Sequence, residues 1–251
     1  DQFSLPQGVK NIIIANLAVF VLLELSGMKL NVFRNFGLIP SQVIFEFRIW
    51  QLFSYMFLHD GFFHILLNML FLWMFGREIE LIWGRNEFYK YYFITGIGAG
   101  LLNSIFSFSS TIPVVGASGA VFSVLLAFAI IYPNRLVLLY GIFPMKVKFM
   151  VLGLAVIALF STILIQHSRI SHLTHLSGMI SGFIYLKGDF MLSLAKKYIN
   201  QKNKSAKIIS MKHKKSQSEE DILIKKNVDK VLDKLNTEGW ENLTDSEQQI
   251  L

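Results

Sequence analysis

Apolar residues in this chain gather into long blocks that short polar or charged segments separate. A helix needs roughly 20 mostly apolar residues to cross the hydrocarbon core of a membrane, and shorter spans are possible inside a bundle. By that measure the pattern predicts an all-α, polytopic membrane protein built as a six-helix bundle. The six predicted spans lie near residues 10–27, 62–82, 88–108, 117–132, 147–166 and 172–187.

Two segments outside these blocks differ from ordinary loops. Residues 28–60 are aromatic and amphipathic, which is typical of a segment that lies in the membrane interface. After about residue 190 the chain becomes polar and rich in Lys, Ser and Gln, as linkers are. We therefore expect a membrane domain at 1–190, a basic linker at 191–217 and a small helical cytoplasmic unit at 218–251.

The final unit is expected to contain two short helices. Apolar residues recur at helical spacing between Ile224 and Leu235, and Gly239 ends that helix. Thr244 and Glu247 have the spacing of a capping box for a final turn. Because two helices of this size bury little surface alone, the unit is expected to be a mobile tail or a docking element.

Composition agrees with a membrane protein. Of the 251 residues, 53% are hydrophobic and 16% are charged, whereas soluble domains carry about 25% charged residues. The net charge is +7, but the lysines gather after the last apolar block, where they indicate topology and contact with anionic lipid, not nucleic acid. Cysteine is absent, which excludes disulfides, thiolate metal sites and a cysteine nucleophile. The first apolar block lacks a small-residue cleavage pattern, so we expect no cleavable signal sequence.

The distribution of Lys and Arg predicts the orientation. The segment around residues 77–90 and the segment 135–148 carry three basic residues each, and the region after residue 190 carries many more. The connection between the third and fourth blocks has none, and the next outer connection has only Arg169. The positive-inside rule therefore places both termini in the cytoplasm. Three basic residues in segment 28–60 weaken this bias without reversing it.

Three polar motifs open the second, fourth and sixth blocks. They read HDGFFHILLN, GASGAVFS and SHLTHLSGMISG. Because the even-numbered helices all begin on the outer side, the polar residues of the three motifs should share the outer half of the bundle. A single polar side chain in a membrane helix most often makes a helix–helix hydrogen bond. Several groups of suitable types in one place indicate a functional site.

These residue types suit hydrolysis by a nucleophilic serine. A histidine within hydrogen-bond reach of a serine acts as its general base. Gly178 shares a helix face with His175, and small residues on both helices permit a close approach that would bring His175 beside Ser118. The developing oxyanion needs donors, which the Ser118 N–H at a helix start, His64 and Asn68 can supply. Ordinary helix packing would explain the glycines alone, and His64 or Asn68 would equally tie neighbouring helices together.

At these residues the chain resembles the rhomboid family of intramembrane serine proteases, over roughly residues 5–190. GASG is similar to the GxSG motif that carries the nucleophile, here Ser118. HLSGMISG is similar to the motif His-x-x-Gly-x-x-x-Gly, with His175 as the base, and HILLN to His-x-x-x-Asn, with His64 and Asn68 in the oxyanion hole. The residues that the resemblance assigns to helix packing at the site are Gly116, Gly119, Phe122, Gly178 and Gly182.

The resemblance also implies how such a protein works. It implies a Ser–His dyad that cleaves transmembrane segments of other membrane proteins, without a cofactor. It implies a multi-pass protein of a bacterial inner membrane, with substrate entry between the second and fifth spans, near Phe62, Phe63 and Phe160. Glu80 corresponds to an acidic residue with a structural role. The C-terminal unit resembles a small domain appended to some bacterial rhomboids.

The chain departs from the family pattern at two positions. Gln51 follows Trp50 where many rhomboids have Arg, and Phe122 stands where Tyr is frequent.

Other functions fit less well. The HExxH motif of zinc metalloproteases and the paired intramembrane Asp residues of aspartyl proteases are missing. His172 and His175 lack an acidic partner for a metal site, and the two-half symmetry of transporters is not present in the sequence. The alternative that stays open is a catalytically silent rhomboid-like protein that binds membrane clients. Substrates and oligomeric state are not predictable from the sequence.

Overall fold

Helices occupy the predicted apolar blocks in the first of the two units into which the chain divides, Asp1–Leu192 and Ser193–Leu251. The computed structural model describes residues 5–139, 143–164, 172–188 and 225–237, together with 239, 244 and 246. In the second unit, residues 225–237 form a helix, and Gly239 beyond it has a φ of 80°. The predicted linker at 191–217 and the partner Glu247 of the predicted capping box lie outside the described residues.

Six helical segments account for the six blocks. Five of them are α1 (Gln7–Ser26), α7 (Arg85–Phe106), α8 (Ser118–Ile131), α9 (Val147–Leu164) and α10 (His172–Lys187). The sixth is continuous and consists of α5 (Phe62–Phe71), a π-helical stretch (Leu72–Gly76) and α6 (Arg77–Trp83). Among the helices of the described residues, α1 alone is both long and apolar enough to count as a candidate membrane span, and α8 and Val147–Ile163 of α9 are apolar but shorter.

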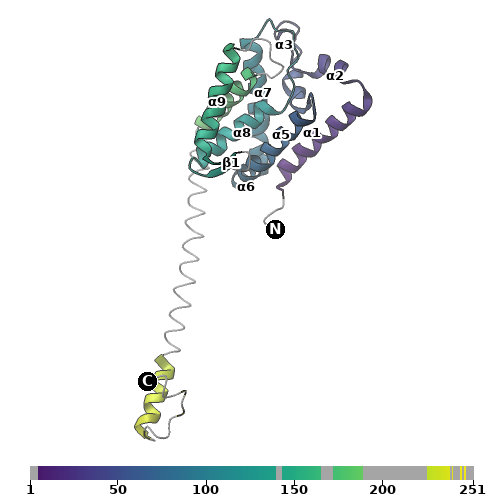
Figure 1. Cartoon of the computed structure of the whole chain (residues 1–251). Helices are drawn as coiled ribbons and strands as arrows, with labels where there is room; N and C mark the ends of the chain where they lie inside the picture. Colours follow the sequence, from purple (N-terminus) through teal and green to yellow (C-terminus); the bar gives the residue numbers. More distant parts are fainter. Residues whose placement is uncertain are drawn as a thin grey trace. The chain divides into compact units, whose positions relative to one another are not determined.

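The long helices of the first unit pack together as a bundle. Helices α7, α8 and α10 pack against one another, α9 packs against α8 and α10, and α1 lies against the segment from α5 to α6. Helix α6 and the strand β1 (Leu136–Leu139) lie at the end of this unit where α1 begins, and α2 (Lys29–Phe36) and α3 (Pro40–Phe45) lie at the opposite end (Figure 1). The chain therefore alternates direction from one long helix to the next.

The first long loop is folded into short helices. After α2 and α3 come α4 (Gln51–Ser54) and a 3₁₀ turn (Tyr55–Phe57). Many of its apolar side chains are exposed, among them Phe45, Phe47 and Trp50. Gln51 is fully buried, where its side chain accepts the Ile39 N–H at 3.0 Å and donates to Gln42 Oε1 at 2.9 Å. The residue that departs from the family pattern therefore joins α4 to the start of α3.

The prediction of an all-α protein omits one element. Strands β1 and β2 (Phe143–Lys146) form an antiparallel hairpin between α8 and α9, with Leu136 opposite Lys146. Pro133 follows the last turn of α8 and Pro144 lies inside β2, and proline has no N–H with which to continue a helix. The residues that follow Pro133 and those around Pro144 pair as strands instead.

Glu80 stabilises the beginning of α1 from a different helix. Its buried carboxylate accepts the backbone N–H groups of Gly8 at 2.7 Å and Val9 at 2.6 Å. These residues lie in the first turn of α1, whose N–H groups have no acceptor within the helix, and a negative charge there also suits the helix dipole. A methyl group on Gly8 would lie 2.8 Å from the Glu80 oxygens, so glycine is needed for this approach. The structural role expected for Glu80 is therefore visible in its contacts.

Replacing Glu80 with alanine is expected to destabilise the protein by about 2–4 kcal/mol, because two buried N–H groups lose a charged acceptor. Unfolding of the purified protein in detergent measures this loss. The matched control is Glu87→Gln, since Glu87 makes an ion pair with the exposed Lys90, and such pairs contribute about 0–1 kcal/mol. Equal stability of Glu80→Ala and Glu87→Gln would contradict the assigned role.

Candidate active site

Ser118 lies at a sharp entry into a helix. It is the first residue of α8, so its N–H has no acceptor within the helix. Gly116, two residues earlier, has a φ of 123°, a conformation that residues with a side chain rarely adopt. A methyl group on Gly116 would also lie 2.7 Å from His64 Nε2. Gly116 was expected to take part in helix packing; it instead lies in the turn before α8, against the side chain of His64.

His175 of α10 meets the serine directly. Its Nε2 lies 2.8 Å from Ser118 Oγ, within hydrogen-bond distance. The ring of Phe122, one turn along α8, stacks on the imidazole with centroids 4.2 Å apart and planes 6° apart. The ring at position 122 thus holds the plane of His175 without a hydroxyl group. This geometry suits a base that accepts the serine proton.

Two glycines of α10 allow this approach. A methyl group on Gly178 would overlap the carbonyl oxygen of Gly119 and lie 2.8 Å from its carbonyl carbon. One turn further, a methyl group on Gly182 would lie 2.9 Å from Ser123 Cβ and 2.7 Å from the hydroxyl of Tyr91. A methyl group on Gly119 would in turn lie 2.8 Å from Ala99 Cβ of α7. The backbones of α8 and α10 are therefore in direct contact beside the site.

His64 and Asn68 lie on α5, one turn apart. His64 Nδ1 faces the N–H of Asp60 at 3.4 Å, and its Nε2 is the atom that lies against Gly116. Asn68 is buried and its amide donates one hydrogen to the His64 carbonyl at 2.9 Å. The amide nitrogen carries a second hydrogen, which keeps Asn68 able to donate elsewhere. The structure thus brings His64 to the turn before Ser118, whereas Asn68 is buried and bonded within α5.

The first loop holds the turn that presents the serine, a role that the sequence analysis missed. Val114 forms an antiparallel bridge with Leu38, and the Gly116 N–H donates to the Tyr55 carbonyl at 2.9 Å. Next along the chain, the Ala117 N–H faces His59 Nε2 at 3.5 Å. His59 in the first polar motif was the sequence feature that could have indicated this role. Its partner Ala117 is 58 residues away, so the contact could not be read from local spacing.

His59 stays neutral in this position. Burial, followed by the nearby His64, lowers the pKa of His59 to about 3. A neutral imidazole keeps Nε2 available as an acceptor for the Ala117 N–H, whereas a protonated ring would present a second donor. The support beneath the serine turn therefore persists throughout the neutral pH range.

No cluster of metal-ligand residues accompanies this arrangement within the described residues. In this part of the chain, no three His, Asp or Glu side chains lie close enough together to hold a metal ion. The rings of His172 and His175 meet edge to face with centroids 6.2 Å apart. The polar groups of the site are thus a serine hydroxyl, the imidazole that contacts it and candidate hydrogen-bond donors.

Comparison with known families agrees with this geometry. The model of the Rhomboid domain matches residues 46–191, more than half of the chain, and includes all three motifs. The chain belongs to the rhomboid family. It is therefore expected in a membrane, as an integral membrane protein, in a family that includes serine proteases cleaving within the bilayer.

Individual relatives support the assignment over part of their length. RHOMBOID-like protein 1 of Arabidopsis thaliana is 32% identical over 65% of this chain and 40% of its own length. The rhomboid protease GluP of Bacillus subtilis is 29% identical over 66% of this chain and 32% of its own length. The mitochondrial rhomboid protein 1 of Saccharomyces cerevisiae is 30% identical over 51% of this chain. The chain thus spans less than half the length of these relatives.

Proposed function

We propose that this rhomboid protein is an intramembrane serine endopeptidase that cleaves transmembrane segments of other membrane proteins with a Ser118–His175 dyad. The observation that carries the proposal is the 2.8 Å separation of His175 Nε2 and Ser118 Oγ beside a helix start. A substrate carbonyl carbon would be attacked by Ser118 Oγ while His175 Nε2 takes the hydroxyl proton. His175 would then give that proton to the leaving amine, and water would hydrolyse the acyl-enzyme.

The oxyanion hole is proposed to combine backbone and side-chain donors. The Ser118 N–H has no intrahelical acceptor, and the Nε2 of His64 lies at the turn that precedes it. Asn68 would contribute its second amide hydrogen. Donors held in place before the reaction stabilise the charge that develops on the carbonyl oxygen without the cost of reorganising solvent.

We propose that all six helical segments cross the membrane with both termini in the cytoplasm. Arg77 begins α6 and Arg135 directly precedes β1, and both elements lie at the end of the unit where α1 begins (Figure 1). Basic residues at that end support its placement on the cytoplasmic side. Residues 1–190 would form the membrane domain, joined by a linker at 191–217 to the cytoplasmic unit at 218–251.

Substrates would enter between α5 and α9, where Phe62, Phe63 and Phe160 are exposed.

The test is covalent labelling of the purified protein in liposomes with a fluorophosphonate probe, followed by peptide mapping, alongside cleavage of a single-span reporter. We expect the adduct on Ser118 and cleavage of the reporter within its transmembrane segment. A protein that binds the reporter without cleaving it, and that carries no adduct, would instead be a catalytically silent member of the family.

A further inference from the structure

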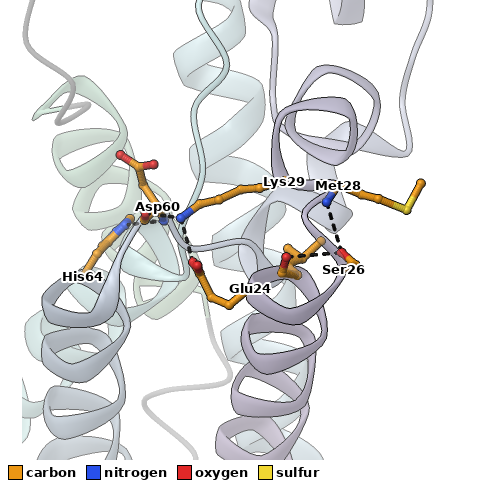
Figure 2. Close-up of polar contacts among 7 residues, drawn as sticks. Glu24, Ser26, Met28, Lys29, Asp60 and His64 are labelled. Carbon is orange, nitrogen blue, oxygen red and sulfur yellow. Dashed lines mark hydrogen bonds and ion pairs between the residues drawn. The ribbon is translucent and has the colours of Figure 1, made fainter.

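A chain of polar contacts connects the end of α1 to the side chain of His64. Lys29, the first residue of α2, lies with its ammonium 2.7 Å from the Glu24 carboxylate near the end of α1. The same ammonium donates to the backbone carbonyl of Asp60, just before α5. Figure 2 shows the Lys29 side chain reaching from α2 to Asp60, with His64 on the other side of Asp60. The lysine thus joins the connection between α1 and α2 to a residue 31 positions further along the chain.

The contact between Asp60 and His64 determines which nitrogen of the ring carries the proton. The Asp60 N–H points at His64 Nδ1, so this nitrogen is the acceptor and a neutral ring carries its hydrogen on Nε2. His64 is the third residue of α5, and its side chain reaches back to the N–H of Asp60, the residue before the N-cap Gly61. The protonated Nε2 is the atom that lies against Gly116, two residues before the serine.

The residues on either side of Asp60 have contacts of their own: His59 Nε2 faces the Ala117 N–H, and the Gly61 carbonyl accepts the Ile65 N–H at 3.1 Å. The Asp60 side chain is exposed, and no atom lies within 4 Å of the position that a methyl group on Gly61 would occupy. Gly61 is also extended, with a φ of −166°, and glycine gives the chain more conformational freedom than any other residue. The hydrogen bond from the half-buried Lys29 to the Asp60 carbonyl therefore restricts Asp60, the residue whose N–H faces His64.

We propose that Lys29 is a positioning residue that acts through the Asp60 backbone to hold the His64 ring with its Nε2–H toward the oxyanion site. The inference rests on the proposed function, because it matters only if an oxyanion forms at Ser118. Lys29 touches neither substrate nor reacting atoms. Its loss frees Asp60, lengthens the contact with Nδ1 and lets the ring turn, so that one donor to the transition state is lost in part.

The variant Lys29→Met keeps the apolar stem and removes the ammonium. We expect kcat for reporter cleavage to fall about five- to tenfold with KM unchanged, since an oxyanion-hole donor acts mainly in the transition state and its complete removal costs about 10²–10³-fold. Lys29→Arg keeps a donor and should restore most of kcat. Thermal unfolding should change little, because ion pairs that are partly exposed contribute little stability.

A double-mutant cycle with His64→Ala separates positioning from general structural support. Once the ring is gone, Lys29→Met should lower kcat less than twofold further, because the two residues act as one unit. Lys90→Met is the matched control, since Lys90 makes a similar ion pair with Glu87 at 2.8 Å and should leave kcat unchanged. The positioning role would be refuted if Lys29→Met lowered kcat by the same factor with and without the His64 side chain. It would also be refuted if Lys29→Met left kcat unchanged when His64 is present.

The same experiments keep the two proposals apart. If the parent cleaves the reporter and Ser118→Ala does not, the protease function stands whatever Lys29→Met does, and an unaffected Lys29→Met refutes the positioning role alone. If the parent neither cleaves the reporter nor reacts with the fluorophosphonate, the protease function fails and the positioning role fails with it.

Discussion

Alanine in place of Ser118 or His175 is expected to lower reporter cleavage by at least about 10⁴-fold, which corresponds to about 5.5 kcal/mol of transition-state stabilisation. Ser118→Ala removes the atom that forms the acyl-enzyme. His175→Ala leaves a serine whose proton has no acceptor, since the nearest described partner of Ser118 Oγ is His175 Nε2 at 2.8 Å. Because the two groups act in one step, the double variant should be no slower than either single variant.

Matched controls distinguish lost chemistry from lost folding. Ser110→Ala removes a serine hydroxyl in the loop before α8 that accepts the Ile112 N–H at 3.4 Å. His172→Ala removes a histidine one turn before His175 on α10. Both controls should retain cleavage within about tenfold of the parent, and all four variants should unfold at similar temperatures. Cleavage that survives Ser118→Ala would refute the proposed mechanism.

Gly178→Ala is expected to destabilise the protein by about 1–3 kcal/mol or more and to lower cleavage at least about 100-fold. The new methyl group would overlap the Gly119 carbonyl oxygen and approach its carbonyl carbon to 2.8 Å. These are backbone atoms, which cannot turn aside as a flexible side chain can. Helix α10 must therefore move away from α8, and His175 moves with it because it lies one turn before Gly178 on the same face.

The matched control for Gly178 is Gly153→Ala in the middle of α9. No atom lies within 4 Å of the position that the new methyl group would take, so the change should be neutral, or slightly stabilising because alanine favours helix over glycine by about 1 kcal/mol. Thermal unfolding in detergent and reporter cleavage measure both effects. If both glycine variants behaved alike, close contact between α8 and α10 would not be what positions the dyad.

Both predictions follow from the way the site is built. The proposed nucleophile and the proposed base lie on two different helices, and each is placed by a backbone feature: the turn at Gly116 and the close contact at Gly178. Side-chain interactions then refine the placement, as the stacking of Phe122 on His175 shows. A loss of backbone contact should therefore harm catalysis more than the loss of one such side-chain contact, because it moves the whole base.

The apolar blocks determined most of the helices. Block positions agree with α1, with the continuous segment from α5 to α6, and with α7 to α10, since a long apolar run with few charges favours a helix wherever it is buried or faces lipid. The π-helical stretch at Leu72–Gly76 and the hairpin between α8 and α9 were not predicted. Neither has a strong local signal, because four-residue strands and a single wide helical turn depend on their neighbours.

The motifs also determined which residues meet. Ser118, His175 and His64 were selected because their types suit acyl transfer and because alternating helices place the starts of the second, fourth and sixth blocks at one end. Helical spacing then placed Gly178 beside His175. These inferences need only local periodicity and the rule that each crossing reverses direction, and both can be read from the order of residues.

Only the tertiary structure decided what holds these residues in place. The contacts of Glu80 with Gly8, of His59 with Ala117 and of Lys29 with Asp60 join segments that are 31 to 72 residues apart. A carboxylate at a helix start, a neutral histidine under a turn and a lysine on a carbonyl all bind backbone groups, and every residue has a backbone. The sequence therefore carries no sign of the partner, and only the folded chain shows which N–H or carbonyl group comes within reach.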